Sequence, residues 1–181
     1  MLNQLNIFLF ETINNFAGHS NLLDNIGIAL AEYLPYIFIL TLIYLWLRKN
    51  KLRNIILYSG YATILGLIIN RLITLVYFHP RPFMDHLGTT ILSHAPESSF
   101  PSDHTTLMLS IAFMFLYFKK TRTTGIILSG LGILGGLARV YVGVHYPLDI
   151  AGSIIVSLIS TSLIFYLQPK FSKLNKLLLN F

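Results

Sequence analysis

The sequence contains no cysteine and few charged residues, and both shortages limit what the protein can be. Without cysteine the chain forms no disulfide bond and no thiolate metal site. Charged residues make up 11% of the 181 residues, less than half of the roughly 25% typical of soluble domains. Hydrophobic residues account for 54%, and successive apolar runs approach or exceed the roughly 18 residues that cross a bilayer. The composition predicts an all-α integral membrane protein, folded as a single domain over residues 1–181.

Five apolar segments predict about five transmembrane helices, over residues 26–47, 54–78, 105–118, 124–142 and 148–167. Residues 1–18 contain no Lys or Arg and no small-residue cleavage site, so we expect no signal peptide. Their leucines recur at helical spacing opposite several asparagines, which predicts an amphipathic helix in the membrane interface. Residues 169–181 mix lysines with leucines and predict a basic amphipathic tail on the anionic cytoplasmic surface.

The basic residues predict the orientation in the membrane. Ten of the thirteen Lys and Arg residues lie at 48–53, 119–122 and 170–176, which five spans place on one side. By the positive-inside rule that side is cytoplasmic. All seven acidic residues and all six histidines fall toward the other side. We therefore expect the amino terminus outside, the carboxyl terminus inside, and membrane lipids rather than nucleic acid as the partners of this basic chain.

The longest polar break, residues 79–104, holds four of the six histidines, and its prolines predict a shaped loop on the outer side. Arg81 in this loop and Arg139 near the outer end of the fourth span lie where the positive-inside rule does not place them. Either one alone fits an arginine that snorkels to the headgroups. Two in the same leaflet as the histidines favour an anion site, because a guanidinium group matches phosphate oxygens in pairs.

The sequence Pro101-Ser102-Asp103-His104 precedes the third span. Ser102 is well placed as the helix N-cap, and the free amides of the helix start with the serine hydroxyl would bind phosphate. A plain cap is the alternative interpretation of Ser102 taken alone. His104 favours the phosphate site, because a helix start does not need a histidine.

A second polar group lies before the fifth span, where Pro147 is expected to open the helix. Asp149 then lies one turn beyond His145 and can hold one nitrogen of its ring. The other nitrogen is left free as a nucleophile or base. The alternative is that Asp149 only stabilises the helix start and His145 is an ordinary interfacial residue.

In this order, Arg81-Pro82, Pro101-Ser102-x-His104 and Arg139-x5-His145-x3-Asp149 resemble the three motifs of the type-2 phosphatidic acid phosphatase superfamily. The wording FHPRPF, HAPESSFPSDH and GVHYPLD resembles the undecaprenyl pyrophosphate phosphatase branch linked to bacitracin resistance. The resemblance implies a six-helix membrane bundle with an active site at the outer face, and residues 79–104 as its catalytic loop.

The resemblance also implies roles for these residues. His145 would attack phosphorus to give a phosphohistidine, and Asp149 would orient it. His104 would protonate the leaving oxygen and then activate water. The remaining motif residues would neutralise the phosphate oxygens: Arg81, Ser102 and Arg139. This scheme needs no metal and no cofactor.

Two positions depart from the superfamily pattern. The family has a lysine seven residues before the arginine of the first motif, where this chain has Thr74. Arg71 lies one helical turn deeper on the same face, and we hypothesise that it binds phosphate in place of the lysine. The alternative is an arginine paired within the bundle. Asp103 stands where the family has glycine, and we assign it to the helix start.

The other loop histidines, His79, His86 and His94, match no ligand spacing of a zinc site. They either bind headgroups or pack the loop, or else His79 or His94 contacts the second phosphate of a diphosphate. Small residues elsewhere predict close helix packing, through Gly132 and Gly136 in the fourth span and through two serines in the fifth.

The expected reaction is hydrolysis of undecaprenyl diphosphate to undecaprenyl phosphate, at the outer face of a bacterial cytoplasmic membrane. This would recycle the lipid carrier of peptidoglycan synthesis. The alternatives are another lipid phosphatase, acting on phosphatidylglycerophosphate, phosphatidate or lipid A, or a non-catalytic lipid binder or translocator. Chain-length preference and oligomeric state are left open by the sequence.

Overall fold

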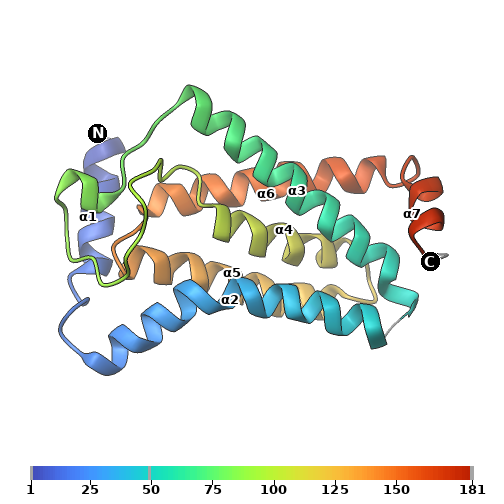
Figure 1. The fold of residues 1–181 in the computed structure, drawn as a ribbon, viewed down its shortest axis with the longest axis horizontal. Helices are drawn as coiled ribbons and strands as arrows, with labels where there is room; N and C mark the ends of the chain where they lie inside the picture. The colour runs from blue at the N-terminus through green and yellow to red at the C-terminus, as the bar shows by residue number, and fades with distance from the viewer. Residues whose placement is uncertain (1, 49, 180–181) are drawn as a thin grey trace.

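The computed structural model describes residues 2–48 and 50–179, and within these ranges it is built of helices without a strand (Figure 1). The elements are α1 (Leu2–Asn14), α2 (Asn21–Arg48), η1 (Asn50–Leu52), α3 (Arg53–Val76), η2 (Pro82–Asp85), α4 (Asp103–Tyr117), α5 (Arg122–Tyr141), α6 (Pro147–Leu167) and α7 (Ser172–Leu179). The predicted all-α fold is confirmed. The helices agree with the predicted segments to within a few residues, and the largest shift is the start of α2, five residues earlier than expected.

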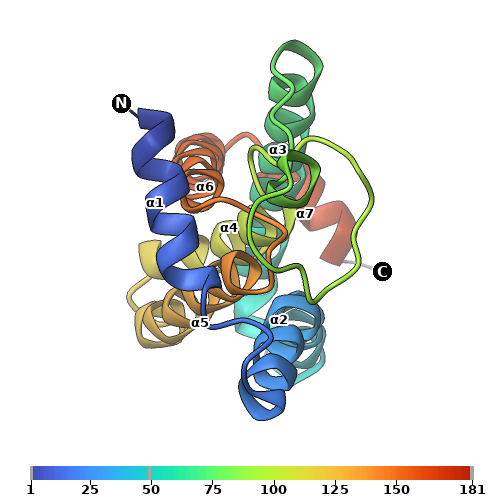
Figure 2. The same ribbon diagram turned by 90° about the vertical axis from the view of Figure 1, so that its left-hand side faces the viewer.

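Within the described chain, four helices are long and apolar enough to cross a membrane: α2, α3, α5 and α6. The remaining predicted span, the third along the chain, is α4, which has 15 residues. At roughly 1.5 Å per residue it is about 22 Å long. It contacts α2, α3, α5 and α6 and lies in the middle of the bundle (Figure 2). Met108, Met114 and Phe115 of α4 are fully buried, so α4 forms the core around which the longer helices pack.

Glycines let α5 approach its neighbours closely, as predicted. A Cβ atom at Gly132 would lie 2.8 Å from a side-chain carbon of Leu109 in α4. One at Gly136 would lie 2.8 Å from a side-chain carbon of Ile150 in α6. Real side chains do not approach this closely, so glycine at these two positions sets the spacing between the helices that carry the motifs.

Serines join α6 to the start of α4. The Ser153 hydroxyl donates to the carbonyl of Ser102 at 3.0 Å, and Ser157 donates to the carbonyl of Thr106 at 3.2 Å. All four residues are buried. Hydrogen bonds between packed helices hold their register, so α6 and the beginning of α4 are fixed relative to each other at the end of the bundle where the motifs lie.

The predicted amphipathic amino-terminal helix is α1, and the face that it turns into the protein is mixed, with Asn6, Phe10 and Asn14. Asn6 and Asn14 are buried, and Asn14 Nδ2 donates to the carbonyl of Tyr141 at 2.7 Å. The Asn6 side chain accepts from the backbone N–H of Leu148 at 3.0 Å. Apolar side chains such as Phe8 point outward, with 63% of Phe8 exposed. This arrangement suits a helix that faces lipid, although its place in the interface stays a prediction.

The two ends of the bundle differ in charge, and Figure 1 shows which elements lie at each end. The turns around η1 and between α4 and α5 lie at the end that bears α7, while α1 and the loop before α4 lie at the other. The three basic clusters therefore gather at the α7 end; Lys49 of the first cluster lies outside the described residues. The predicted basic tail contains α7, whose Asn175 is buried against Asn54 and Tyr61. The last two residues of that tail, 180 and 181, lie outside the described residues too.

Candidate active site

A tight reversal after α5 places His145. Gly143 has a φ of +84°, a conformation that side-chain-bearing residues rarely adopt, and the Thr89 carbonyl packs where a Cβ atom would stand. The N–H groups of Val144 and His145 both donate to the carbonyl of Arg139, at 3.1 and 3.3 Å. The chain thus turns back on the end of α5 and presents His145 between α5 and α6, buried to 2% exposure.

The start of α6 holds the partner of His145, as its spacing predicted. Pro147 occupies the first turn of the helix, with Tyr146 as the N-cap. Asp149 Oδ2 accepts from the backbone N–H of Tyr146 at 2.8 Å and lies 3.2 Å from His145 Nδ1. Asp149 therefore caps its own helix and holds the histidine ring with the same oxygen atom.

Arg81 determines which nitrogen of the His145 ring carries the hydrogen. Its Nη1 atom donates to the carbonyl of Val144 at 2.9 Å and lies 3.2 Å from His145 Nε2. Because a guanidinium group has no acceptor, Nε2 accepts and the ring hydrogen is on Nδ1, directed at Asp149. Burial, followed by the charges of Arg139 and Arg81, lowers the pKa of His145 well below 6.5. His145 is therefore neutral, with the lone pair of Nε2 beside a cation.

His145 and Arg81 share a small cavity of about 130 Å³, the front pocket. Its walls come from α3, the loop before α4, the first turn of α4 and the α5–α6 turn; they include Arg71, Thr74, Arg81, His94, Glu97, Asp103, His104 and His145. The structure thus brings Arg71 into the same cavity as the motif residues, beside Thr74, which occupies the position of the family lysine. Asp103 is exposed in the first turn of α4, where its carboxylate accepts from Asn70.

The front pocket contains an acid, Glu97, that the sequence suggested only as a disfavoured metal ligand and did not place in the phosphate site. Glu97 Oε1 lies 3.3 Å from Arg81 Nη2 and 3.7 Å from His94 Nδ1, with 61% of its side chain exposed. Burial, and then the charge of Arg81, lowers the pKa of His94. No local pattern announces these contacts, since Arg81 and Glu97 are 16 residues apart in an irregular loop.

Two expected phosphate ligands lie behind the wall of the front pocket. Arg139 is buried and its Nη1 atom donates to the carbonyl of Ala31 in α2 at 2.9 Å. Ser102 is the N-cap of α4, as predicted, and its hydroxyl accepts from the backbone and side chain of Thr105. Within the described residues the Nε atoms of Arg81 and Arg139 have no hydrogen-bond acceptor. Buried unpaired donors of this kind favour an anionic ligand.

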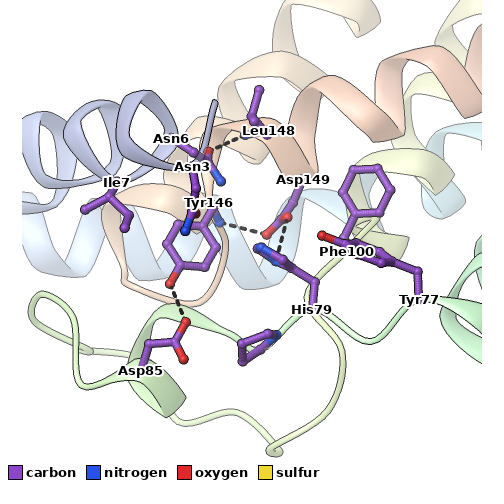
Figure 3. Close-up of a pocket in the computed structure, with 11 residues that line it drawn as sticks. Asn3, Asn6, Ile7, Tyr77, His79, Asp85, Phe100, Tyr146, Leu148 and Asp149 are labelled. Carbon is purple, nitrogen blue, oxygen red and sulfur yellow. Dashed lines mark hydrogen bonds and ion pairs between the residues drawn. The ribbon is translucent and has the colours of Figure 1, made fainter. Parts of the chain in front are cut away.

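A larger cavity of about 490 Å³, the rear cavity, opens beside Asp149 (Figure 3). It is enclosed by α1, the end of α3, the loop and the start of α6; its walls include Asn3, Asn6, Tyr77, His79, Asp85, Phe100, Tyr146, Leu148 and Asp149. The structure therefore separates the loop histidines that the sequence left unassigned. His79 lies in the rear cavity, His94 in the front pocket, and His86 is exposed at the end of η2.

The comparisons with known proteins agree with this geometry. The family model of the PAP2 superfamily matches residues 55–173, which include all three motifs. Undecaprenyl-diphosphatase BcrC of Bacillus subtilis (strain 168) is 42% identical over 162 residues, 89% of this chain and 83% of that protein. Bacitracin transport permease protein BcrC of Bacillus licheniformis is 33% identical over 97% of this chain and 86% of that protein.

A solved structure supports the fold. The crystal structure of Aquifex aeolicus LpxE superimposes with a TM-score of 0.76 and 26% sequence identity, covering 90% of this chain and 95% of that one. The match in sequence extends over most of both chains, and the match in structure extends over nearly the whole bundle. The chain belongs to the PAP2 superfamily.

Proposed function

We propose that this protein hydrolyses undecaprenyl diphosphate to undecaprenyl phosphate and inorganic phosphate. The observation that carries the proposal is the line Arg81–His145–Asp149, which leaves a neutral Nε2 lone pair next to a guanidinium group. The diphosphate as substrate is supported by the 42% identical relative, which is named an undecaprenyl-diphosphatase. A metal ion is not part of this mechanism, because the nucleophile and the charges come from side chains.

In the first step His145 Nε2 attacks the terminal phosphorus, and the bond from that phosphorus to the bridging oxygen breaks. The bridging oxygen leaves with the electron pair as part of undecaprenyl phosphate. The developing positive charge on the ring is stabilised by Asp149 through Nδ1–H. Arg81 stands beside Nε2 and neutralises the oxygens of the transferred phosphoryl group, which is where phosphoryl transfer needs stabilisation.

In the second step His104, in the wall of the front pocket, takes a proton from water as the water oxygen attacks the phosphohistidine. The N–P bond breaks, its electron pair returns to His145 Nε2, and inorganic phosphate is released. The same His104 protonates the bridging oxygen in the first step, so one residue gives and then receives the proton. Burial and the charge of Arg139 lower the pKa of His104 to about 4, so this step requires the bound diphosphate anion to raise that pKa. Ser102 and Arg139 shape the site from behind the wall of the pocket.

The isoprenoid tail would lie against the outer end of α3. Leu72, Leu75 and Val76 are exposed there by 57%, 67% and 87%, while Arg71 and Thr74 on the same turns line the front pocket. One end of this helix thus offers polar groups to a diphosphate and apolar groups to lipid. A substrate whose headgroup enters the pocket can keep its tail in the membrane, which suits a long polyprenyl chain.

We place the protein in the bacterial cytoplasmic membrane with the site outside and α7 inside, as one phosphatase domain over residues 1–181. The gathering of basic clusters at the α7 end supports this orientation. The chain has no cysteine, so single cysteines are specific probes. In intact cells, His19→Cys should react with a membrane-impermeant maleimide and Lys173→Cys should react only after the membrane is opened. The reverse pattern would refute the orientation.

Phosphate release by the purified protein in detergent, with a chelator present, tests the function. Undecaprenyl diphosphate, phosphatidylglycerophosphate and phosphatidate are compared at equal concentration, and His145→Ala is measured beside His19→Ala, a histidine replacement outside both cavities. We expect fastest release from the diphosphate, loss in His145→Ala and retention in His19→Ala. Faster release from another lipid would reassign the substrate. Binding without release would make the protein a lipid binder, and full loss in chelator would contradict the metal-free mechanism.

A further inference from the structure

The catalytic carboxylate is only half satisfied by the residues that the mechanism uses. Asp149 Oδ2 accepts two hydrogen bonds, from His145 and from the backbone of Tyr146. Asp149 Oδ1 is equally buried, with 1% of the side chain exposed, and has no hydrogen-bond donor within the described part of the chain. A buried carboxylate oxygen without a donor is unfavourable, because it has lost its water and gained nothing in return. The structure therefore calls for a donor on the side of the rear cavity.

Two side chains next to this oxygen carry a hydrogen that could be donated to it, His79 and Ser99. The Nδ1 atom of His79 lies 3.7 Å from Asp149 Oδ1 (Figure 3). The same Nδ1 atom lies 2.8 Å from the hydroxyl of Ser99. The Ser99 hydroxyl donates its own hydrogen to the carbonyl of Pro80 at 3.3 Å, so it accepts from His79. The ring hydrogen of His79 is therefore on Nδ1. If the distance from Nδ1 to Asp149 Oδ1 shortened from 3.7 Å to roughly 2.9 Å, this hydrogen could be donated to Oδ1.

The surroundings hold His79 in this position. Its backbone N–H donates to Ser98 Oγ and its carbonyl accepts from the backbone N–H of Ser99. The ring stacks on Tyr77 at 5.9 Å between centroids and meets the edge of Tyr146 at 5.2 Å. These contacts come from the end of α3, the loop and the start of α6. His79 is thus held by three separate elements, next to a catalytic oxygen that lacks a donor. Packing of the loop alone does not require this arrangement.

We propose that His79 is a positioning residue that acts on the reaction through Asp149. Its Nδ1–H donates to Asp149 Oδ1 when His145 is phosphorylated, and it keeps the carboxylate ionised with Oδ2 directed at the His145 ring. His79 lies in the rear cavity, away from the front pocket, so it does not contact the second phosphate of the substrate. This removes one of the two residues considered for that contact and leaves His94.

The inference rests on the proposed function and is tested by kinetics with undecaprenyl diphosphate. His79→Ala removes a hydrogen bond to a charged group, which should lower kcat roughly 10- to 100-fold. The KM value should stay within about twofold, because ground-state contacts in the front pocket are untouched. His94→Ala, a histidine replacement in the front pocket, should instead raise KM.

Two further variants separate a donor from mere volume. An asparagine amide can stand where His79 Nδ1 stands, so His79→Asn should recover most of the lost kcat. His79→Gln places its amide near the position of Nε2 and should not. Free imidazole should also restore turnover to His79→Ala, because the rear cavity is large enough to admit it. Both Asn and Gln keep the site filled, so they carry the comparison even if the alanine variant fails to fold.

Equal kcat in wild type and His79→Ala would overturn the inference, as would a rise in KM at unchanged kcat. It would also be overturned if His79→Asn were as slow as His79→Gln, since that result excludes a donor at Nδ1. The proposed function fails separately, if the wild-type protein releases no phosphate from the diphosphate or releases it faster from another lipid. Turnover of the wild type thus tests the proposed function, and the ratio of kcat between the variants tests the role of His79.

Discussion

The front pocket and the rear cavity lie on either side of the His145–Asp149 pair, and the charged residues in their walls differ. The front pocket, of about 130 Å³, contains His145 and is lined by two arginines, two further histidines and two carboxylates. The rear cavity, of about 490 Å³, contains Asp149 and is lined by carboxylates, amides and aromatic rings; none of its described lining residues is Lys or Arg. The His145–Asp149 pair joins them.

This difference identifies the phosphate site by charge rather than by size. A diphosphate in the larger cavity would face Asp85 and Asp149 without a cation in the wall, which is strongly unfavourable. In the smaller pocket the same anion meets the nucleophile and two guanidinium groups, Arg71 and Arg81. Two acids, Asp103 and the largely exposed Glu97, offset those charges only in part. The larger cavity serves the reaction indirectly, by giving His79 access to the far oxygen of Asp149.

The largest expected effect is that of replacing the nucleophile His145, which belongs to the pair between the front pocket and the rear cavity. His145→Gln should lower kcat by a factor on the order of 10⁴ or more, because removing a nucleophile disables the whole catalytic unit. Substrate should still bind, since Arg71 and Arg81 remain. The measurement is steady-state turnover together with binding of a non-hydrolysable diphosphate. Residual activity within tenfold of the wild type would assign the attack to another group.

A smaller effect is expected for Arg71, which tests the front wall alone. Arg71→Ala should raise KM for the diphosphate roughly tenfold, because a charge-assisted contact with phosphate is lost. Adding Thr74→Lys, which places a lysine at the family position in the same pocket, should restore affinity in the double variant. If Arg71→Ala leaves turnover and affinity unchanged, Arg71 does not replace the family lysine.

The smallest effect is expected for Glu97, an acid in a pocket built for an anion. Glu97 competes with phosphate for Arg81 Nη2 and is largely exposed, so its influence is screened by water and salt. Glu97→Gln should make inorganic phosphate a stronger inhibitor by about threefold, and the gain should shrink as salt is added. Glu11→Gln, which replaces an exposed acid of α1 outside both cavities, is the matched control. Weaker inhibition in Glu97→Gln would mean that the acid supports phosphate binding.

Sequence reasoning succeeded where the determining interactions are local. Long apolar runs gave the helices, Ser102 gave the cap of α4, and the spacing of His145 and Asp149 gave their hydrogen bond. Contacts between residues far apart in the sequence could not be predicted in this way. Arg139 meets the carbonyl of Ala31 across 108 residues, and His79 meets Asp149 across the whole middle of the protein. No local pattern specifies such pairs.

The direction in which α1 faces was also beyond local reasoning. Its leucines and asparagines form two faces, but a pattern of this kind does not say which face meets the protein. In water the apolar face would turn inward. Here Asn6 and Asn14 make hydrogen bonds on the inward side beside the buried Phe10. Leu5, Phe8 and Leu9 remain exposed, which suits a helix that faces lipid.

The central claim is that His145 carries the phosphoryl group, and trapping the intermediate tests it most directly. Undecaprenyl diphosphate labelled in its terminal phosphate is mixed with the protein in chelator and quenched in alkali, in which phosphohistidine survives. The account predicts labelled protein with the label on His145, lost on acidification and missing in His145→Gln. Label on a different residue, or rapid phosphate release without labelled protein at any time after mixing, would contradict it.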